Sequence, residues 1–189
     1  MQWAIGDVVL RVDHVAFGSP DIDDAINRLA SLGLSHTAVS VSKWTQSDHD
    51  HEARSVSVVL DDGYLDIIEL PASSIGAGEP IFPTGVILGS TDLHATRRRL
   101  MTAGVRCGRP YGIDRHFDPD HSPQHYTVFG VDVRHSSGLP LGVDVRHSSG
   151  LPLGVIETTS TAPMAITVDH GDGPSTLAAA ARQLGVDLE

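Results

Sequence analysis

The chain opens with an apolar strand pattern that leads directly into a helical pattern. "VDHVAF" (12–17) predicts a strand, because short runs rich in β-branched and aromatic residues favour extended chain. In "SPDIDDAINRLASLG" (19–33), Ile22, Ile26 and Leu29 recur at the spacing of one helix face. Together the two patterns predict a strand followed by an amphipathic helix.

Both ends of this helix carry signals. Ser19 or Asp21 can cap its start, and Pro20 suits its first turn. Gly33 predicts its end, because glycine readily adopts the left-handed conformation that follows many helices. The helix is therefore predicted to lie within residues 19–33.

The remainder of the first half alternates between strand and turn patterns. "RSVSVVL", the turn sequence "DDG" and "YLDIIEL" predict two strands joined by a tight turn. "PASSIGAGEPIFPTG" (71–85) is rich in proline, glycine and small residues and predicts a connector. Predicted strands cover 36–44, 54–60 and 64–70, and a polar loop covers 45–53.

The pattern then repeats at a constant offset of 71 residues. The matched pairs are Gly18 and Gly89, Ser19 and Ser90, Asp21 and Asp92, Ile22 and Leu93, Leu29 and Leu100, and Gly33 and Gly104. All are capping, helix-ending or core positions, so the match indicates an internal repeat. Strand patterns at 105–113, 125–133 and 151–159 follow the second helix, so each half reads β-α-β-β-β.

These elements predict an α+β fold. We expect paired βαβββ modules that form a curved, partly open sheet around a cleft, with the helices outside. The first module is predicted at 1–75 and the second at 80–160. A C-terminal extension at 161–189 is predicted to hold one strand and one helix.

A second repeat is of another kind. "VDVRHSSGLPLG" occurs twice without change, at 131–142 and 143–154. Identity of this kind indicates a recent tandem duplication, because diverged architectural repeats do not stay identical. We expect the extra residues to form a protruding hairpin or loop. Such a loop is one candidate contact for a homodimer.

Composition narrows the function classes. The 189 residues are 40% hydrophobic and 20% charged, which is typical of a globular protein, and the formal net charge of −11 makes nucleic acid an unfavourable partner. A single cysteine, Cys107, fits a reducing compartment. No signal peptide or membrane-spanning stretch is present, so we expect a cytoplasmic protein with no membrane partner. Eleven histidines motivate a search for a metal site.

The strand patterns supply three candidate metal ligands. His14 lies on the first predicted strand, where it would share a face with Val12 and Ala16. Glu69 ends the last strand of the first half, and Glu157 stands in a matching "IE" context in the second half. Paired modules would bring such positions together in the cleft, where a divalent ion (Zn, Fe, Mn, Ni or Mg) could bind. Either glutamate could also move a proton as a catalytic group.

Plainer interpretations stand beside this one. A lone strand histidine is more often a core residue than a ligand, and strand glutamates often face solvent. The repeat places Gly85 opposite His14, so one ligand position is empty; His125 could fill the gap. The histidines at 49–51 and 116–125 fall in predicted loops, where a solvated surface is the default.

At this point the residues resemble a known family. "VDHVAFGSPDIDDAINRLASLGL" resembles the opening of proteins of the vicinal oxygen chelate superfamily, which includes glyoxalase, bleomycin-resistance and extradiol dioxygenase proteins. "DDGYLDIIEL" and "LPLGVIETT" resemble the last strands of the two modules in its glyoxalase-like branch. The resemblance implies metal ligands on the first and last strands, by position His14, Glu69 and Glu157. Gly85 departs from the full four-ligand pattern.

Three functions are compatible with this resemblance. One is a divalent-metal-dependent lyase, isomerase or dioxygenase that acts on a small oxygenated metabolite. Another is a metal-free protein that binds or sequesters a small molecule, as bleomycin-resistance proteins do. A third is a catalytically silent scaffold. The predicted ligand-binding residues are Trp44, Tyr64, His125, Tyr126 and Phe129, with Tyr111 as a further wall candidate.

Overall fold

The computed structural model describes residues 2–5, 8–46, 49–71, 81–117, 122–132, 153–157 and 173–188. The first half contains β1 (Gln2–Ile5), β2 (Val8–Ser19), α1 (Ile22–Ser31), β3 (Ser40–Gln46), β4 (His49–Leu60) and β5 (Gly63–Glu69). The second half contains β6 (Phe82–Ser90), α2 (Leu93–Thr102), β7 (Arg106–Cys107), β8 (Tyr111–His116), β9 (Gln124–Asp132) and β10 (Leu153–Glu157). The last described element is α3 (Leu177–Gln183).

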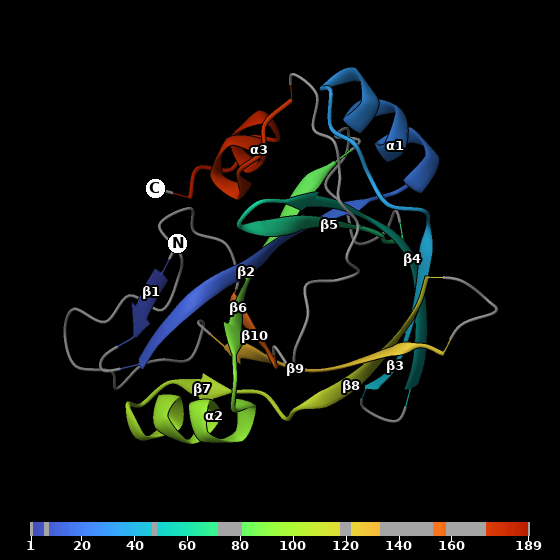
Figure 1. Cartoon of the computed structure of the whole chain (residues 1–189). Helices are drawn as coiled ribbons and strands as arrows, with labels where there is room; N and C mark the ends of the chain where they lie inside the picture. Colours follow the sequence, from blue (N-terminus) through green and yellow to red (C-terminus); the bar gives the residue numbers. More distant parts are fainter. Residues whose placement is uncertain are drawn as a thin grey trace.

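The strands form a ring that closes within one chain (Figure 1). Neighbouring strands pair in the order β2-β5-β4-β3-β8-β9-β10-β6, and β6 pairs back with β2. The two halves therefore meet twice, at the antiparallel pairs β2–β6 and β3–β8. This confirms the predicted α+β class and curved sheet, and it adds closure of the cleft by the β3–β8 pairing.

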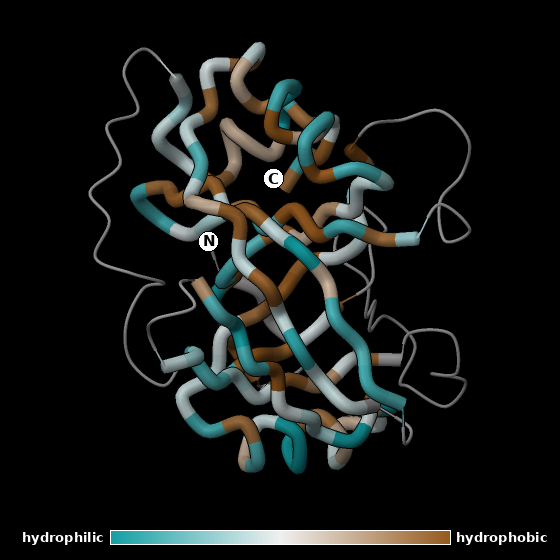
Figure 2. Tube along the Cα trace, turned by 90° about the vertical axis from the view of Figure 1, so that its right-hand side faces the viewer, coloured by the Kyte–Doolittle hydropathy of each residue, from teal (hydrophilic) through white to brown (hydrophobic). Residues whose placement is uncertain are grey.

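The helices lie outside the ring, as predicted. α1 packs on β4 and β5, α3 on β2 and β5, and α2 on β7 and β10. Figure 2 shows the helical segments at both ends of the molecule with strands crossing between them. The hydrophobic core fills the space between strands and helices, and its fully buried members include Phe17, Leu29, Leu65, Leu100 and Leu177.

The starts of α1 and α2 confirm the internal repeat. Asp21 Oδ1 accepts hydrogen bonds from the backbone at the start of α1, and Asp92 Oδ1 accepts one from Ala95 N at 2.7 Å. Ser19 Oγ and Ser90 Oγ each accept from the N–H of the capping aspartate at 3.2 Å. Asp21 is thus the cap, and Ser19 supports it from outside the helix. Pro20 precedes the cap instead of entering the first turn.

The helix ends repeat in the same way. Gly33 and Gly104 have φ values of 70° and 88°, in the left-handed region that glycine adopts without strain. Leu34 N donates to Leu29 O at 3.0 Å, and Val105 N donates to Leu100 O at 2.9 Å. The offset of 71 residues therefore relates real structural equivalents.

Three predicted boundaries were wrong. The polar loop at 45–53 is largely strand, because residues 49–53 of β4 pair with residues 42–46 of β3. The predicted connector at 71–85 ends early, since Phe82 to Gly85 join β6 and pair with β2. The strand predicted at 36–44 begins only at Ser40. Backbone pairing across the sheet overrides polar or turn-like composition in the first two cases, and in the third the strand begins where its pairing with β4 begins.

Several predictions fall outside the described residues. These are the duplicated segment from residue 133 to residue 152, the proposed strand at 164–170, and part of the loop at 116–125. The predicted C-terminal helix is present as α3, anchored by a 2.6 Å hydrogen bond from Leu177 N to Asp62 Oδ1. In the part of the chain that the structure describes, no helix has the length and apolar character to cross a membrane.

Candidate functional site

The interior of the ring contains a cavity of about 350 Å³. Side chains from both halves line it, on β2, β3, β5, β6, β8, β9 and β10. Its aromatic wall consists of Trp44, Tyr64, Tyr111, Tyr126 and Phe129. All five were among the wall candidates named from the sequence. The polar lining residues include His14, Asp66 and Arg115.

A β-bulge at Asp13 turns His14 toward this cavity. Val12 pairs with Leu88 and His14 pairs with Ile87, so Asp13 is an extra residue on β2. Val12 lies in the hydrophobic core, whereas His14 and Ala16 line the cavity. The expected shared face of Val12 and His14 was therefore wrong, because the bulge shifts the side-chain alternation by one position.

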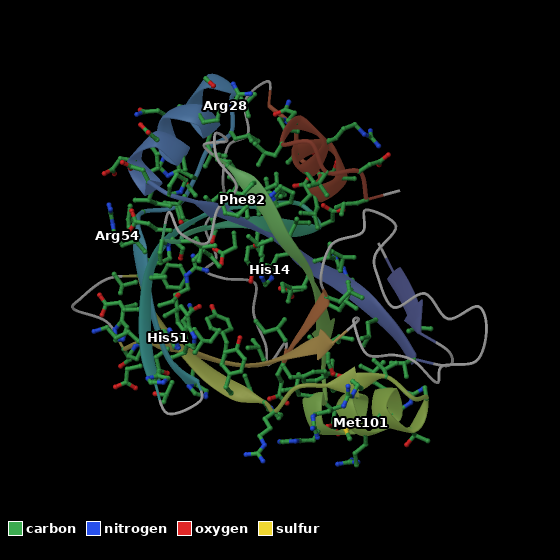
Figure 3. All side chains as sticks on the ribbon, turned by 180° about the vertical axis from the view of Figure 1, so that it is seen from behind. His14, Arg28, His51, Arg54, Phe82 and Met101 are labelled. Carbon is green, nitrogen blue, oxygen red and sulfur yellow. The ribbon has the colours of Figure 1, made fainter. Side chains whose placement is uncertain are left out.

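The bulge also brings the Asp13 carboxylate to the His14 ring. Asp13 Oδ1 lies 2.8 Å from His14 Nδ1. The imidazole stacks on the Tyr64 ring with centroids 4.3 Å apart, and His14 is only 7% exposed. Figure 3 shows His14 near the middle of the barrel, whereas Arg54 and Met101 lie on its outside.

Tyr64 experiences a negative electrostatic environment. Burial raises the pKa of its hydroxyl well above the ordinary value of 10, and the carboxylates of Asp13 and Asp66 raise the pKa further. The Arg115 guanidinium opposes them and lowers it. Burial likewise raises the pKa of Tyr126, and Arg115 again lowers it. Both phenols therefore remain protonated hydrogen-bonding groups at neutral pH.

Arg115 is the centre of a buried polar network. Its Nη2 lies 3.0 Å from Asp66 Oδ1 and donates to Ser57 Oγ at 2.9 Å, and its Nε donates to Ser40 Oγ at 2.8 Å. Ser57 Oγ also donates to Asp66 Oδ1 at 3.0 Å. Arg115 and Asp66 are 5% and 8% exposed. The guanidinium charge is thus compensated by a carboxylate on the opposite half of the barrel.

Glu69 does not face the cavity. Leu65, Ile67 and Glu69 alternate with the cavity-lining residues of β5 and lie on the α1 side. Glu69 Oε1 accepts a hydrogen bond from Ile22 N at the start of α1, at 3.2 Å, and lies 3.3 Å from Arg54 Nη1. A carboxylate at a helix N-terminus stabilises the helix, so Glu69 has a structural role at the start of α1.

Glu157 takes the equivalent position in the second half. It pairs with Ser90 in the parallel pair β10–β6, as Glu69 pairs with Ser19 in β5–β2. It is not among the cavity-lining residues. His125 is also elsewhere: it is exposed, and its Nδ1 lies 2.7 Å from Asp114 Oδ1. The structure does not bring His14, Glu69 and Glu157 together as predicted, because Glu69 lies on the α1 side and Glu157 is not among the cavity-lining residues.

Comparisons with known proteins show which solved structures share this fold. Models of known protein families and curated proteins gave no match. Among solved structures, a hypothetical protein from Bacillus halodurans matches with a TM-score of 0.52 at 12% identity, over 82% of this chain and 99% of that chain. A methylmalonyl-CoA epimerase variant from Streptomyces coelicolor in complex with 2-nitronate-propionyl-CoA matches with a TM-score of 0.50 at 12% identity, over 80% and 96%. The chain has the vicinal oxygen chelate fold.

The vicinal oxygen chelate fold raises the question of a metal ion, and among the described residues the donors on the cavity wall do not form a metal-binding set. His14 and Asp66 are the first-half donors on the cavity wall. The offset of 71 and the pairings of Ala16 with Asp66 and of Ile87 with Gly154 place Gly85 and Gly154 at the corresponding second-half positions. Among the described residues, no group of three or more His, Cys, Asp or Glu could hold a metal ion.

Sequence reasoning missed Asp66 and Arg115. "YLDIIEL" offers two acidic residues, and the matching "IE" of the second half favoured Glu69 over Asp66. The alternation Tyr64, Asp66, Ile68 was available as a signal, because Tyr64 was already a predicted wall residue. Arg115 had no comparable signal, since its partners Ser40, Ser57 and Asp66 are distant in sequence.

Proposed function

We propose that this chain binds a small organic molecule in the barrel cavity without the help of a metal ion. The observation that carries the proposal is the cavity itself, whose volume of about 350 Å³ is within the range of small-molecule sites. Aromatic rings from both halves form part of its wall, with Trp44, Tyr64, Tyr126 and Phe129 beside aliphatic side chains. Apolar and aromatic lining with a few polar groups is the usual composition of such sites.

The donor set supports metal-free binding over a metal-dependent lyase, isomerase or dioxygenase. Asp66 is held by Arg115 and Ser57, so a metal ion would have to compete with a guanidinium for this carboxylate. The second-half counterparts of His14 and Asp66 are Gly85 and Gly154, which carry no donor side chain. The function that fits best is recognition or sequestration, the metal-free alternative that bleomycin-resistance proteins of the same superfamily illustrate.

A matched pair of variants tests the proposal. Val128 lines the cavity, whereas Val9 is 58% exposed on β2. We expect uncharged aromatic fragments to give saturation-transfer NMR signals with the wild type and with Val9→Phe. Val128→Phe should abolish these signals, because the larger side chain takes up cavity volume. Binding should be the same before and after treatment with a chelator.

Two outcomes would overturn this function. Fragments that still bind Val128→Phe are not bound in the cavity. Binding that disappears on chelation and returns with one divalent ion would establish a metal site instead.

A further inference from the structure

We propose that His14 accepts a hydrogen bond from a hydroxyl group of the ligand, so that the cavity selects hydroxylated aromatic molecules over their ethers. This inference rests on the proposed ligand-binding function and names the chemical class that the site takes. It assigns to His14 a role as a hydrogen-bond acceptor instead of a metal ligand.

The contact with Asp13 decides which ring nitrogen of His14 carries the proton. Asp13 Oδ1 lies 2.8 Å from Nδ1 of His14, and an ionised carboxylate can only accept a hydrogen bond. Nδ1 must therefore carry the proton that is donated to Asp13. In the neutral ring this leaves a lone pair on Nε2, which makes Nε2 an acceptor.

Close packing holds the His14 ring in one orientation. His14 stacks on Tyr64 with an interplanar angle of 20°, and both residues are more than nine-tenths buried. The bulge is held closely from the next strand, since a Cβ on Gly63 would lie 2.7 Å from the Asp13 carbonyl oxygen. The imidazole cannot turn over without disturbing this packing, so the bound edge stays toward Asp13 and the opposite edge stays available.

The cavity surroundings of His14 favour a hydrogen bond from a ligand to Nε2. His14 lines the cavity, and its one hydrogen bond within the described part of the chain is at Nδ1. Ala16 and Ile87 are its apolar neighbours on the cavity wall. An acceptor in such surroundings gains more from a ligand donor than it would in water, because the local dielectric is low.

The charges around the cavity favour an uncharged ligand group over an anionic one. Within the described residues, the cavity region holds two carboxylates, Asp13 and Asp66, against the guanidinium of Arg115, and Asp66 already compensates Arg115. A ligand carboxylate would add a third negative charge near Tyr64, where both aspartates already raise the hydroxyl pKa. An uncharged hydroxyl group avoids this repulsion and still satisfies Nε2.

Two probes of nearly equal shape test the inference. 4-Methylphenol has a hydroxyl donor, and 4-methylanisole carries a methyl ether in its place. One added hydrogen bond of about 1.4 kcal/mol corresponds to a tenfold change in affinity, so we expect wild-type protein to bind the phenol about tenfold more tightly. His14→Phe keeps a flat ring against Tyr64 but removes the acceptor. Its affinity ratio should fall to about one while it still binds the ether.

The chain offers a matched control. His125 and Asp114 form a second Asp–His pair, at 2.7 Å, outside the cavity lining. His125→Phe should keep the tenfold preference. A second measurement needs no variant: in ¹⁵N NMR spectra of the wild type, His14 should be the Nδ1-protonated tautomer, and only the phenol should shift its Nε2 signal.

The outcomes separate this inference from the proposed function. If the wild type binds both probes equally, or if His14→Phe keeps the preference, the inference is overturned and cavity binding stands. If neither probe binds the wild type, both the inference and the proposed function are contradicted. An Nε2-protonated tautomer in the NMR spectra would also overturn the inference.

Discussion

Arg115 on β8 and Asp66 on β5 form an ion pair inside the barrel, with Nη2 3.0 Å from Oδ1. The two residues belong to different halves of the repeat, so the pair connects the halves through the barrel interior. Both side chains are almost fully buried, which makes the pair sensitive to the loss of either partner.

We predict that Asp66→Ala lowers the free energy of unfolding by about 3–5 kcal/mol, because it leaves a buried guanidinium without its counter-charge. Urea unfolding followed by circular dichroism measures this. Asp23→Ala is the control, since Asp23 pairs with Arg54 at 3.5 Å on the exposed surface and should lose no more than about 1 kcal/mol. Equal losses in the two variants would contradict the prediction.

The replacement of both partners gives a second prediction. The double variant Asp66→Leu with Arg115→Met should regain most of the stability lost in Asp66→Ala, because apolar side chains carry no desolvation cost. The same unfolding experiment tests it. A double variant less stable than Asp66→Ala would show that the serines of the network depend on Arg115 more than on charge balance.

Glu69 should behave as a helix-stabilising residue. Glu69→Ala removes the acceptor for Ile22 N and should lower the free energy of unfolding by about 0.5–2 kcal/mol. Glu69→Gln keeps an acceptor oxygen and should lose less. Fragment binding should be unchanged in both variants. Loss of binding at unchanged stability would restore Glu69 as a site residue.

The bulge at Asp13 should depend on the absence of a side chain at residue 63. Gly63→Ala would place a Cβ 2.7 Å from the Asp13 carbonyl oxygen, and relief of this clash should cost about 1–3 kcal/mol. Gly130→Ala is the control, because its Cβ would meet nothing within 4 Å. Thermal unfolding of the two variants compares them. Equal melting temperatures would mean that the bulge tolerates the added methyl group.

Alkaline pH should destabilise the protein through Cys107. Burial raises the pKa of this thiol from 9 to about 11. The unfolded chain therefore loses the proton first, so the stabilising effect is complete below pH 9 and is lost as pH rises toward 11. Urea unfolding across this range should show a smaller decline for Cys107→Ala. An identical decline in both proteins would assign the effect to other groups, such as buried Tyr64.

How much of this molecule could be predicted from its sequence depends on the range of the interaction. The helix starts, the helix-ending glycines and the strand–turn–strand at 54–70 were predicted, because each follows from neighbours a few residues apart, although the sequence left the cap open between Ser19 and Asp21. The sequence analysis missed that residues 49–53 form a strand. These residues pair with β3, and local composition does not show how far β3 extends. Arg115 was missed because its three partners come from three other strands.

The sequence by itself determined the repeat at an offset of 71 and, apart from β1 and the short β7, the βαβββ order of each half. Only the tertiary structure decided that β3 pairs with β8 to close the ring, and that Asp66 instead of Glu69 faces the cavity. The physical reason is that a strand between a helix and a barrel interior is buried on both faces, so alternation gives two sets of residues without saying which is inside. On β2, the extra residue at Asp13 also shifts the side-chain alternation by one position. Such a bulge forms only when the partner strand is in place.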